Sequence, residues 1–153
     1  MKKTIVLIVL SIILVTSNFG VEQKLIAPDS VYEGNINAGK SNVRIGAGAE
    51  VKGNIFIEEG DLFIASDVSV NGSITIKKGN IFIKNNLNTG NNITIHNGNF
   101  TMGKDNLIKA SIICKNGIIR MASGNNIDSD IYAKELRQGP KNNIKGKFIK
   151  TDK

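Results

Sequence analysis

The chain has 153 residues, 41% of them hydrophobic and 22% charged, a composition typical of one globular domain. Its one Cys and one His exclude an internal disulfide framework and a paired-histidine metal site. Trp is absent, aromatic residues make up 5%, and the formal net charge is +7. These values disfavour a large aromatic-lined enzyme cleft and favour anionic partners.

Residues 1–17 have the order of an export signal. Two lysines precede an apolar run from Ile5 to Val15, and small or polar residues follow it. The 11 residues of this run (15 − 5 + 1) are few compared with the ~20 of a membrane-spanning helix. We expect cleavage after Ser17 and export to the periplasm or cell envelope. The alternative is an uncleaved N-terminus that anchors the protein to the inner membrane.

A repeat of 19 residues governs residues 34–136. One apolar column of this repeat is Ile36, Ile55, Ile74, Ile93, Ile112 and Ile131. Similar columns begin two residues later at Ala38, and at Val43, Ile45, Ala49 and Val51. Within each repeat the apolar residues alternate with others, which is typical of half-buried strands.

These columns predict the fold class. Each repeat supplies three short strands, and stacking of successive repeats brings equivalent residues into register. We predict an all-β protein, a three-sided parallel β-helix of about six 19-residue coils. Because 19 is not a multiple of six, a left-handed hexapeptide helix is disfavoured, and the preference of parallel crossovers favours a right-handed coil. Outward positions then include the lateral-surface candidates Phe56, Phe63, Phe82 and Ile113.

Turn residues follow the same period. Gly60, Gly79, Gly98 and Gly117 precede a strand in successive repeats, as expected at a corner with positive φ, and the column lacks Gly at Ser41 and Leu136. Asn residues recur at other corners and suit tight bends. We expect their side chains to hydrogen-bond along the axis of the coil.

Both ends of the repeat are less regular. Residues 18–33 form a lead-in with a partial coil that begins near Leu25, and residues 137–153 form a last partial coil with a basic tail. Uncapped β-helix ends present open strand edges, so we assign Leu25, Ile26, Phe148 and Ile149 as polymer-end candidates. The tail contributes Lys141, Lys145, Lys147 and Lys150, which could contact anionic wall polymer or phospholipid or could simply be solvated.

The sequence predicts no catalytic, metal or cofactor site. Cys114 occupies an inward column and is expected to pack as a small hydrophobic residue. His96 has no second His or Cys at a ligand spacing. Asp67 and Asp105 are separated by Asn86 in one corner column, so they do not form a converging pair of acids. We therefore expect a protein that is not an enzyme.

The openings Gly34-Asn35-Ile36, Gly53-Asn54-Ile55 and Gly72-Ser73-Ile74, with the segment IGAGAEVKGNI at residues 45–55, resemble bactofilins, the polymer-forming cytoskeletal proteins of bacteria. The resemblance covers residues 34–131. It implies a right-handed β-helix that polymerises end to end without nucleotide and acts as a scaffold. The leader departs from the family, whose members are typically cytoplasmic, and indicates an exported relative.

Two functions follow as expectations. The first is a non-enzymatic scaffold of the bacterial cell envelope that polymerises with itself, with cell-wall polymer or an anionic membrane surface as further partners and no nucleic acid or nucleotide. The alternative is a monomeric, secreted, adhesin-like or glycan-binding module. An enzyme that acts on polysaccharide ranks third, because the acidic residues do not converge.

Overall fold

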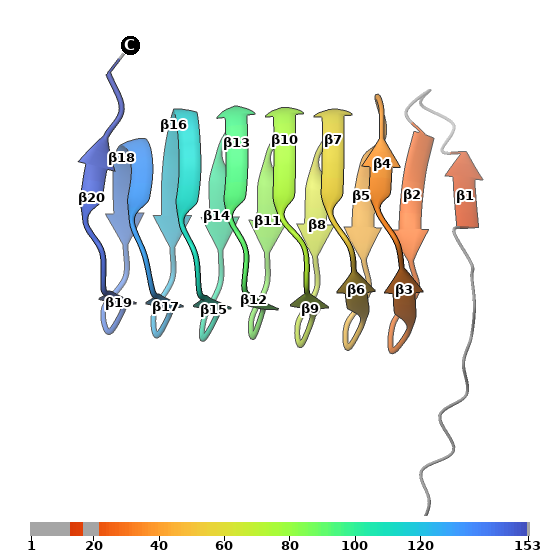
Figure 1. Ribbon diagram of the computed structural model, residues 1–153, viewed down its shortest axis with the longest axis horizontal. Helices are drawn as coiled ribbons and strands as arrows, with labels where there is room; N and C mark the ends of the chain where they lie inside the picture. The colour runs from red at the N-terminus through yellow and green to blue at the C-terminus, as the bar shows by residue number, and fades with distance from the viewer. Residues whose placement is uncertain (1–12, 17–21, 153) are drawn as a thin grey trace, which may run out of the picture.

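The computed structural model describes residues 13–16 and 22–152, and all regular elements among them are strands. Apart from β1 (Ile13–Thr16), the strands line three faces of a coil, which Figure 1 shows from the side. The first face contains β4 (Ile36–Ala38), β7 (Ile55–Glu59), β10 (Ile74–Lys78), β13 (Ile93–Asn97), the starts of β16 (Ile112–Met121) and β18 (Ile131–Gln138), and β20 (Phe148–Lys150). The second contains β2 (Glu22–Ile26), β5 (Asn42–Ile45), β8 (Leu62–Ile64), β11 (Ile81–Ile83), β14 (Phe100–Met102) and the ends of β16 and β18. The third contains β3 (Val31–Glu33), β6 (Glu50–Lys52), β9 (Ser69–Val70), β12 (Asn88–Thr89), β15 (Leu107–Ile108), β17 (Asn126–Ile127) and β19 (Asn143–Ile144).

The winding is that of a right-handed β-solenoid. In Figure 1 the nearer strands β7, β10 and β13 run upward, the more distant β8, β11 and β14 run downward, and the third face joins them at the bottom while the chain advances from right to left. This confirms the predicted class and hand. The third face holds seven strands, so the solenoid has about seven turns. The prediction of about six coils was low, because both irregular end segments pair as rungs.

Equivalent residues of successive coils lie side by side. Ile74 of β10 pairs with Ile55 of β7 on one side and with Ile93 of β13 on the other, in parallel register. The predicted inward columns form the core, where most of these side chains are less than 2% exposed. Full burial of an Ile or Leu side chain contributes roughly 1.5–3 kcal/mol, so the aliphatic columns are the main source of stability.

The last coil is shorter than the others. Ile131 pairs with Phe148 and Asn126 with Asn143, a step of 17 residues (148 − 131) rather than 19. The register changes within the pairing of β16 with β18, between Cys114 and Ile118. As a result Leu136 pairs with Ile119 and continues an inward column, so its predicted place in the Gly column is wrong.

One corner column has positive φ in every coil. Between the second and third faces φ lies between 54° and 77° at residues of mixed type: Asp29, Gly48, Asp67, Asn86, Asp105, Gly124 and Lys141. Gly, Asn and Asp tolerate this left-handed conformation better than other residues do. The predicted Gly column lies at another corner, where φ is 153° at Gly60, 139° at Gly79 and 150° at Gly98. The prediction of positive φ is wrong for Gly117, which lies at the register change in β16.

Ladders of Asn side chains also run along the axis, as predicted. Asn42, Asp61, Asn80 and Asn99 each accept a hydrogen bond at Oδ1 from the backbone N–H of the next coil, at 2.7–3.1 Å. A second ladder, Asn106, Asn125 and Asn142, runs beneath the corner between the second and third faces, and its first two members are completely buried. Each buried side-chain nitrogen and oxygen in the described part of the chain has a partner.

Ahead of the first coil, β1 pairs antiparallel with β2 from Ile13–Leu25 to Thr16–Glu22. The rest of the predicted leader, residues 1–12 and 17, lies outside the described residues. Within residues 13–16 and 22–152 no helix is long and apolar enough to cross a membrane.

Candidate interaction surfaces

The C-terminal end of the rod is an open rung. β19 and β20 are the last strands of their sheets. Phe148 continues the inward Ile column beyond Ile131, but nothing covers it in the described chain, and it is 42% exposed. Its neighbour Ile149 is 38% exposed. Leu136 and Ile144 pack against the core from the same last coil and are only partly buried. This end therefore presents apolar side chains beside free strand edges.

The N-terminal end is arranged differently. β1 occupies the outer edge of β2, and Lys24, which holds an inward register position next to Val43, donates from Nζ to the carbonyl oxygen of Asn37 on β4. Figure 1 shows β1 beside β2 at this end, opposite β20. The predicted end residue Ile26 is 3% exposed and belongs to the core, whereas Leu25 is half-buried in the outward column.

Part of this end is nevertheless open. β3 ends its sheet, and its residue Val31 is 40% exposed. Tyr32 lies in the inward register of Val51 and is partly buried against the core. Large exposed hydrophobic residues in the described chain therefore gather at its two ends, with Phe82 on the side as the exception.

The second face carries an aromatic pair on its outer side. Phe63 and Phe82 lie on adjacent rungs, and their rings stack with centroids 5.1 Å apart and planes inclined by 10°. The guanidinium of Arg44 lies 5.1 Å from the centroid of Phe63. Phe82 is 39% exposed, whereas Phe63 is half-buried. On the first face Phe56 and Ile113 are half-buried, and Lys77 Nζ lies 5.5 Å from the Phe56 centroid.

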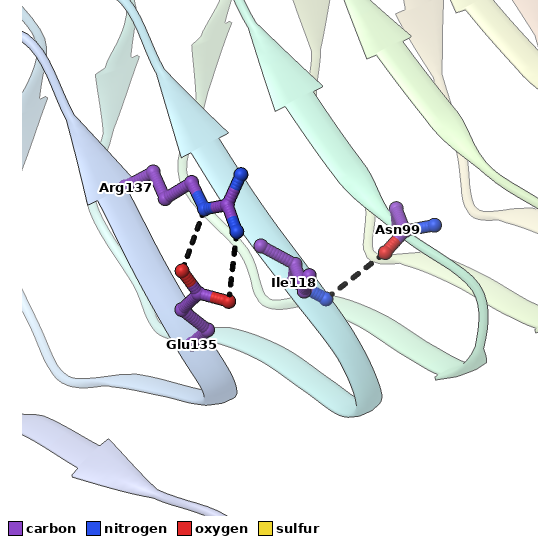
Figure 2. A network of polar contacts seen from close by, with 4 residues as sticks. All are labelled: Asn99, Ile118, Glu135 and Arg137. Carbon is purple, nitrogen blue, oxygen red and sulfur yellow. Dashed lines mark hydrogen bonds and ion pairs between the residues drawn. The ribbon is translucent and has the colours of Figure 1, made fainter.

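Further along the second face, Arg120 and Arg137 are neighbours on adjacent rungs. They line a shallow groove of about 370 Å³ with Thr101 and Gln138. The Arg137 guanidinium donates to both carboxylate oxygens of Glu135, at 2.6 and 3.3 Å, as Figure 2 shows. This hydrogen bond, helped by the charges of Arg137, Arg120 and Lys150, lowers the pKa of Glu135. The Glu135 carboxylate thus neutralises part of the positive charge here.

Figure 2 also shows how one Asn ladder ends beside this ion pair. The backbone N–H of Ile118 donates to Asn99 Oδ1 at 3.1 Å. Ile118 follows the register change in β16, and its rung partner is Glu135. The ladder therefore stops where the last coil becomes shorter.

The predicted basic tail lies on the last coil. Lys141, Lys145, Lys147 and Lys150 are all exposed. Lys145 forms an ion pair with Asp128 at 2.8 Å, and Lys150 belongs to the edge strand β20. The tail is thus folded as far as residue 150, and its lysines surround the open end.

The residues with nucleophilic or ionisable side chains that the sequence analysis considered lie in the core, in the hydrogen-bond ladders or on a face of the coil. Cys114 is completely buried and donates from Sγ to the Gly98 carbonyl at 3.2 Å, and burial raises the pKa of its thiol to about 11. The Asp61 carboxylate accepts from both backbone and side-chain nitrogens of Asn80. His96 is half-buried on the first face. Within the described ranges no group of three His, Cys, Asp or Glu residues could hold a metal ion.

Comparison with protein-family models, curated proteins and solved structures finds no match to this chain. Its function is therefore argued from its own surfaces. The polymer-end candidates Phe148 and Ile149 are exposed at the C-terminal end, and their role stays a prediction. Sequence reasoning did not single out Val31, Lys24 or Leu136. A signal for Val31 was present, because it precedes Tyr32, which lies 19 residues before Val51.

Proposed function

We propose that the protein is a non-enzymatic, self-assembling β-solenoid that polymerises end to end without nucleotide, as a bactofilin-like scaffold of the bacterial cell envelope. The observation that carries the proposal is the open C-terminal rung. A strand edge that ends a sheet offers unpaired N–H and C=O groups to another chain, and here Phe148 and Ile149 place apolar area beside it.

Stacking of a second copy on this end can continue the solenoid. If the register of the coil carries on, the C-terminal Phe148 meets Ile36 of the next copy and Ile144 meets Tyr32, since these residues hold equivalent inward positions. Such contacts would bury Phe148 much as Ile131 is buried now. Lysines around the end oppose uncontrolled association by charge, as edge lysines do in natural sheets.

The proposal is tested with residues 18–153, purified without nucleotide and imaged by negative-stain electron microscopy over a concentration series. We expect filaments above a threshold concentration. The double variant Phe148→Lys/Ile149→Lys should remain folded by circular dichroism and stay monomeric in sedimentation velocity, because two charges on the rung disfavour stacking.

The matched control is Phe82→Lys/Asn88→Lys. It adds the same charge at exposed lateral positions in the middle of the rod. We expect it to form filaments like the parent chain. Filaments from the end variant would remove the C-terminal rung from the interface. Monomers from both variants would contradict an end-specific contact, because the added charge alone would then prevent assembly.

A second function is favoured by the stacked Phe63–Phe82 pair, which forms an exposed aromatic surface next to Arg44. In this alternative the protein is a monomeric, secreted glycan-binding or adhesin-like module, with cell-wall polymer as its partner. A chain that stays monomeric at every concentration and cosediments with purified cell wall would support it. In that case Phe82→Lys/Asn88→Lys should lose binding.

A further inference from the structure

The outer edge of β2 lies at the N-terminal end of the rod. This edge is occupied by β1 through four residue pairs, from Ile13–Leu25 to Thr16–Glu22. Five residues, 17–21, connect the two strands (21 − 17 + 1). A strand has only one outer edge, so while β1 is paired no other strand can bind there.

The same edge is the one that end-to-end stacking needs. In a stack that continues the register, the end of β18 (residues 135–138) follows the second face and lies beside β2 of the next copy, as it lies beside β16 within its own chain. β1 and a second copy therefore compete for one edge. The competition is unequal, since a short connection gives β1 an effective concentration in the millimolar range.

β1 lies on the N-terminal side of the expected cleavage site. Cleavage after Ser17 would remove all four residues of β1, and it would leave the paired residues of β2 in the mature chain. The buried residues of the part of the chain whose burial is described, from Ile26 onward, would all remain in the mature chain.

We infer that the outer edge of β2 is a docking surface for a second copy of this chain, and that the protein's own residues 13–16 block it until the leader is removed. The inference rests on the proposed polymerisation. It makes leader removal the event that permits growth at the N-terminal end, so the precursor would be kept from assembling through this edge before cleavage.

The experiment uses the full chain with a specific protease site in place of residues 17–21 and with the substitutions Val15→Cys and Gln23→Cys. These two residues are cross-strand partners, and antiparallel partners lie about 4.5–5.5 Å apart at Cα, within disulfide range. The buried Cys114 does not compete for the new thiols. Uncut protein, cut and oxidised protein, and cut and reduced protein dialysed free of the leader peptide are compared in the same mild detergent.

We expect filaments from the cut and reduced sample at a threshold concentration about 100-fold below that of the other two samples. If β1 and a second copy bind β2 with the same intrinsic affinity, a millimolar effective concentration of β1 exceeds about 10 µM of the second copy by this factor. Hydrogen exchange of the β2 amides should be slow with β1 attached, fast after its removal, and slow again in filaments.

Equal thresholds in the cut samples, oxidised and reduced, would overturn the inference and leave the proposed polymerisation intact. Absence of filaments in all three samples at every concentration would overturn both. As a second route, Leu14→Pro/Val15→Pro in the uncut chain should lower the threshold, because one of two adjacent strand residues must donate to β2. Leu14→Ala/Val15→Ala keeps both donors and is its control.

Discussion

At the scale of single residues, the thiol of Cys114 reports on the polarity of the core. It lies in the inward column between Ile95 and Ala133. Burial raises its pKa from 9.0 to about 11, because the thiolate loses its hydration, and a hydrogen bond with the Phe100 backbone offsets only part of this. The neutral thiol is therefore the form that the folded state requires.

This shift predicts a loss of stability at high pH. The folded pKa lies above the unfolded value, so the contribution of Cys114 is complete below pH 9 and is lost as the pH rises toward 11. Two pKa units correspond to about 2–3 kcal/mol of unfolding free energy. The control Cys114→Ala, which places the residue of Ala38 and Ala133 in this column, should lack this decrease. Urea unfolding of both proteins at pH 8, 10 and 11 measures it, and parallel pH profiles would contradict the assignment.

Gly98 shows how closely the coils approach at the corner before the second face. Its φ is 150°, and a Cβ placed on it would overlap the carbonyl oxygen of Gly79 in the preceding coil. Gly90 makes a matched comparison, since a Cβ there has nothing within 4 Å.

We expect Gly98→Ala to lower the unfolding free energy by at least about 1–3 kcal/mol, the cost of one strained backbone site. Gly90→Ala should leave it unchanged or raise it slightly, because it restricts the unfolded chain without a clash. Urea denaturation of the two variants tests this, and an equal loss in both would mean that the corner can relax.

At the scale of elements, the buried Asn ladder replaces an apolar column. The column contains Ala49, Val68 and Leu87 in the earlier coils and Asn106, Asn125 and Asn142 in the later ones. Asn125 is its centre: Oδ1 accepts from the backbone and side chain of Asn106, and Nδ2 donates to Gly103 O at 3.0 Å.

Asn125→Leu should therefore destabilise the protein even though Leu occupies the same column at Leu87. The change leaves the N–H groups of Asn106 and the Gly103 carbonyl without their partner, at about 1–3 kcal/mol for each buried group. The comparison variant is Asn54→Ser, in an exposed column that Ser73 continues in the next coil. It should lower the unfolding free energy by less than about 1 kcal/mol. Thermal and urea unfolding compare them, and a stabilised Asn125→Leu would show that packing outweighs these hydrogen bonds.

The sequence predicted these elements wherever residue type and period agreed. Inward Ile, Leu and Val at a constant step determine the strands and their register, so β7 to β14 follow the prediction closely. The prediction failed where the step between coils changes. In β16 the corner contains three residues, Lys115–Gly117, whereas the same corner in β18 contains Lys134 alone, and a constant period of 19 cannot show this shortening. It also missed the positive-φ column, in which Asp, Asn, Gly and Lys alternate.

At the scale of the whole molecule, the two ends of the rod differ in which strand edges are paired, and the 19-residue period does not reveal this difference. An apolar run such as Ile5–Val15 can serve as a leader or, in part, as a strand, and only the structure places residues 13–16 on β2. Likewise Lys24 stands in a column of apolar residues because its long side chain can reach the Asn37 carbonyl at the edge of β4. The polymer-end candidates could be named from the sequence, but the difference between a blocked and an open end could not.

This difference between the ends determines the order in which the coils unfold. In a solenoid each coil contacts only its neighbours, so unfolding begins at the end with the weakest rung. That rung is the C-terminal one: β19 and β20 have a neighbour on one side only, and Phe148 is 42% exposed. At the N-terminal end β3 and β4 also have one neighbour, but there β1 covers β2. The central strands β10, β11 and β13 are paired on both sides.

We therefore expect amide hydrogen exchange of the monomeric chain to be fastest in β19 and β20, slowest in β10 to β14, and graded between them. Exchange measured by mass spectrometry on the full chain, in which β1 covers β2, provides the profile below the polymerisation threshold. Phe148→Lys/Ile149→Lys should quicken exchange in the last two coils and leave the central coils unchanged. Uniform protection along the chain would instead mean that the seven turns unfold as one cooperative unit, and the fraying end would then have no part in controlling growth.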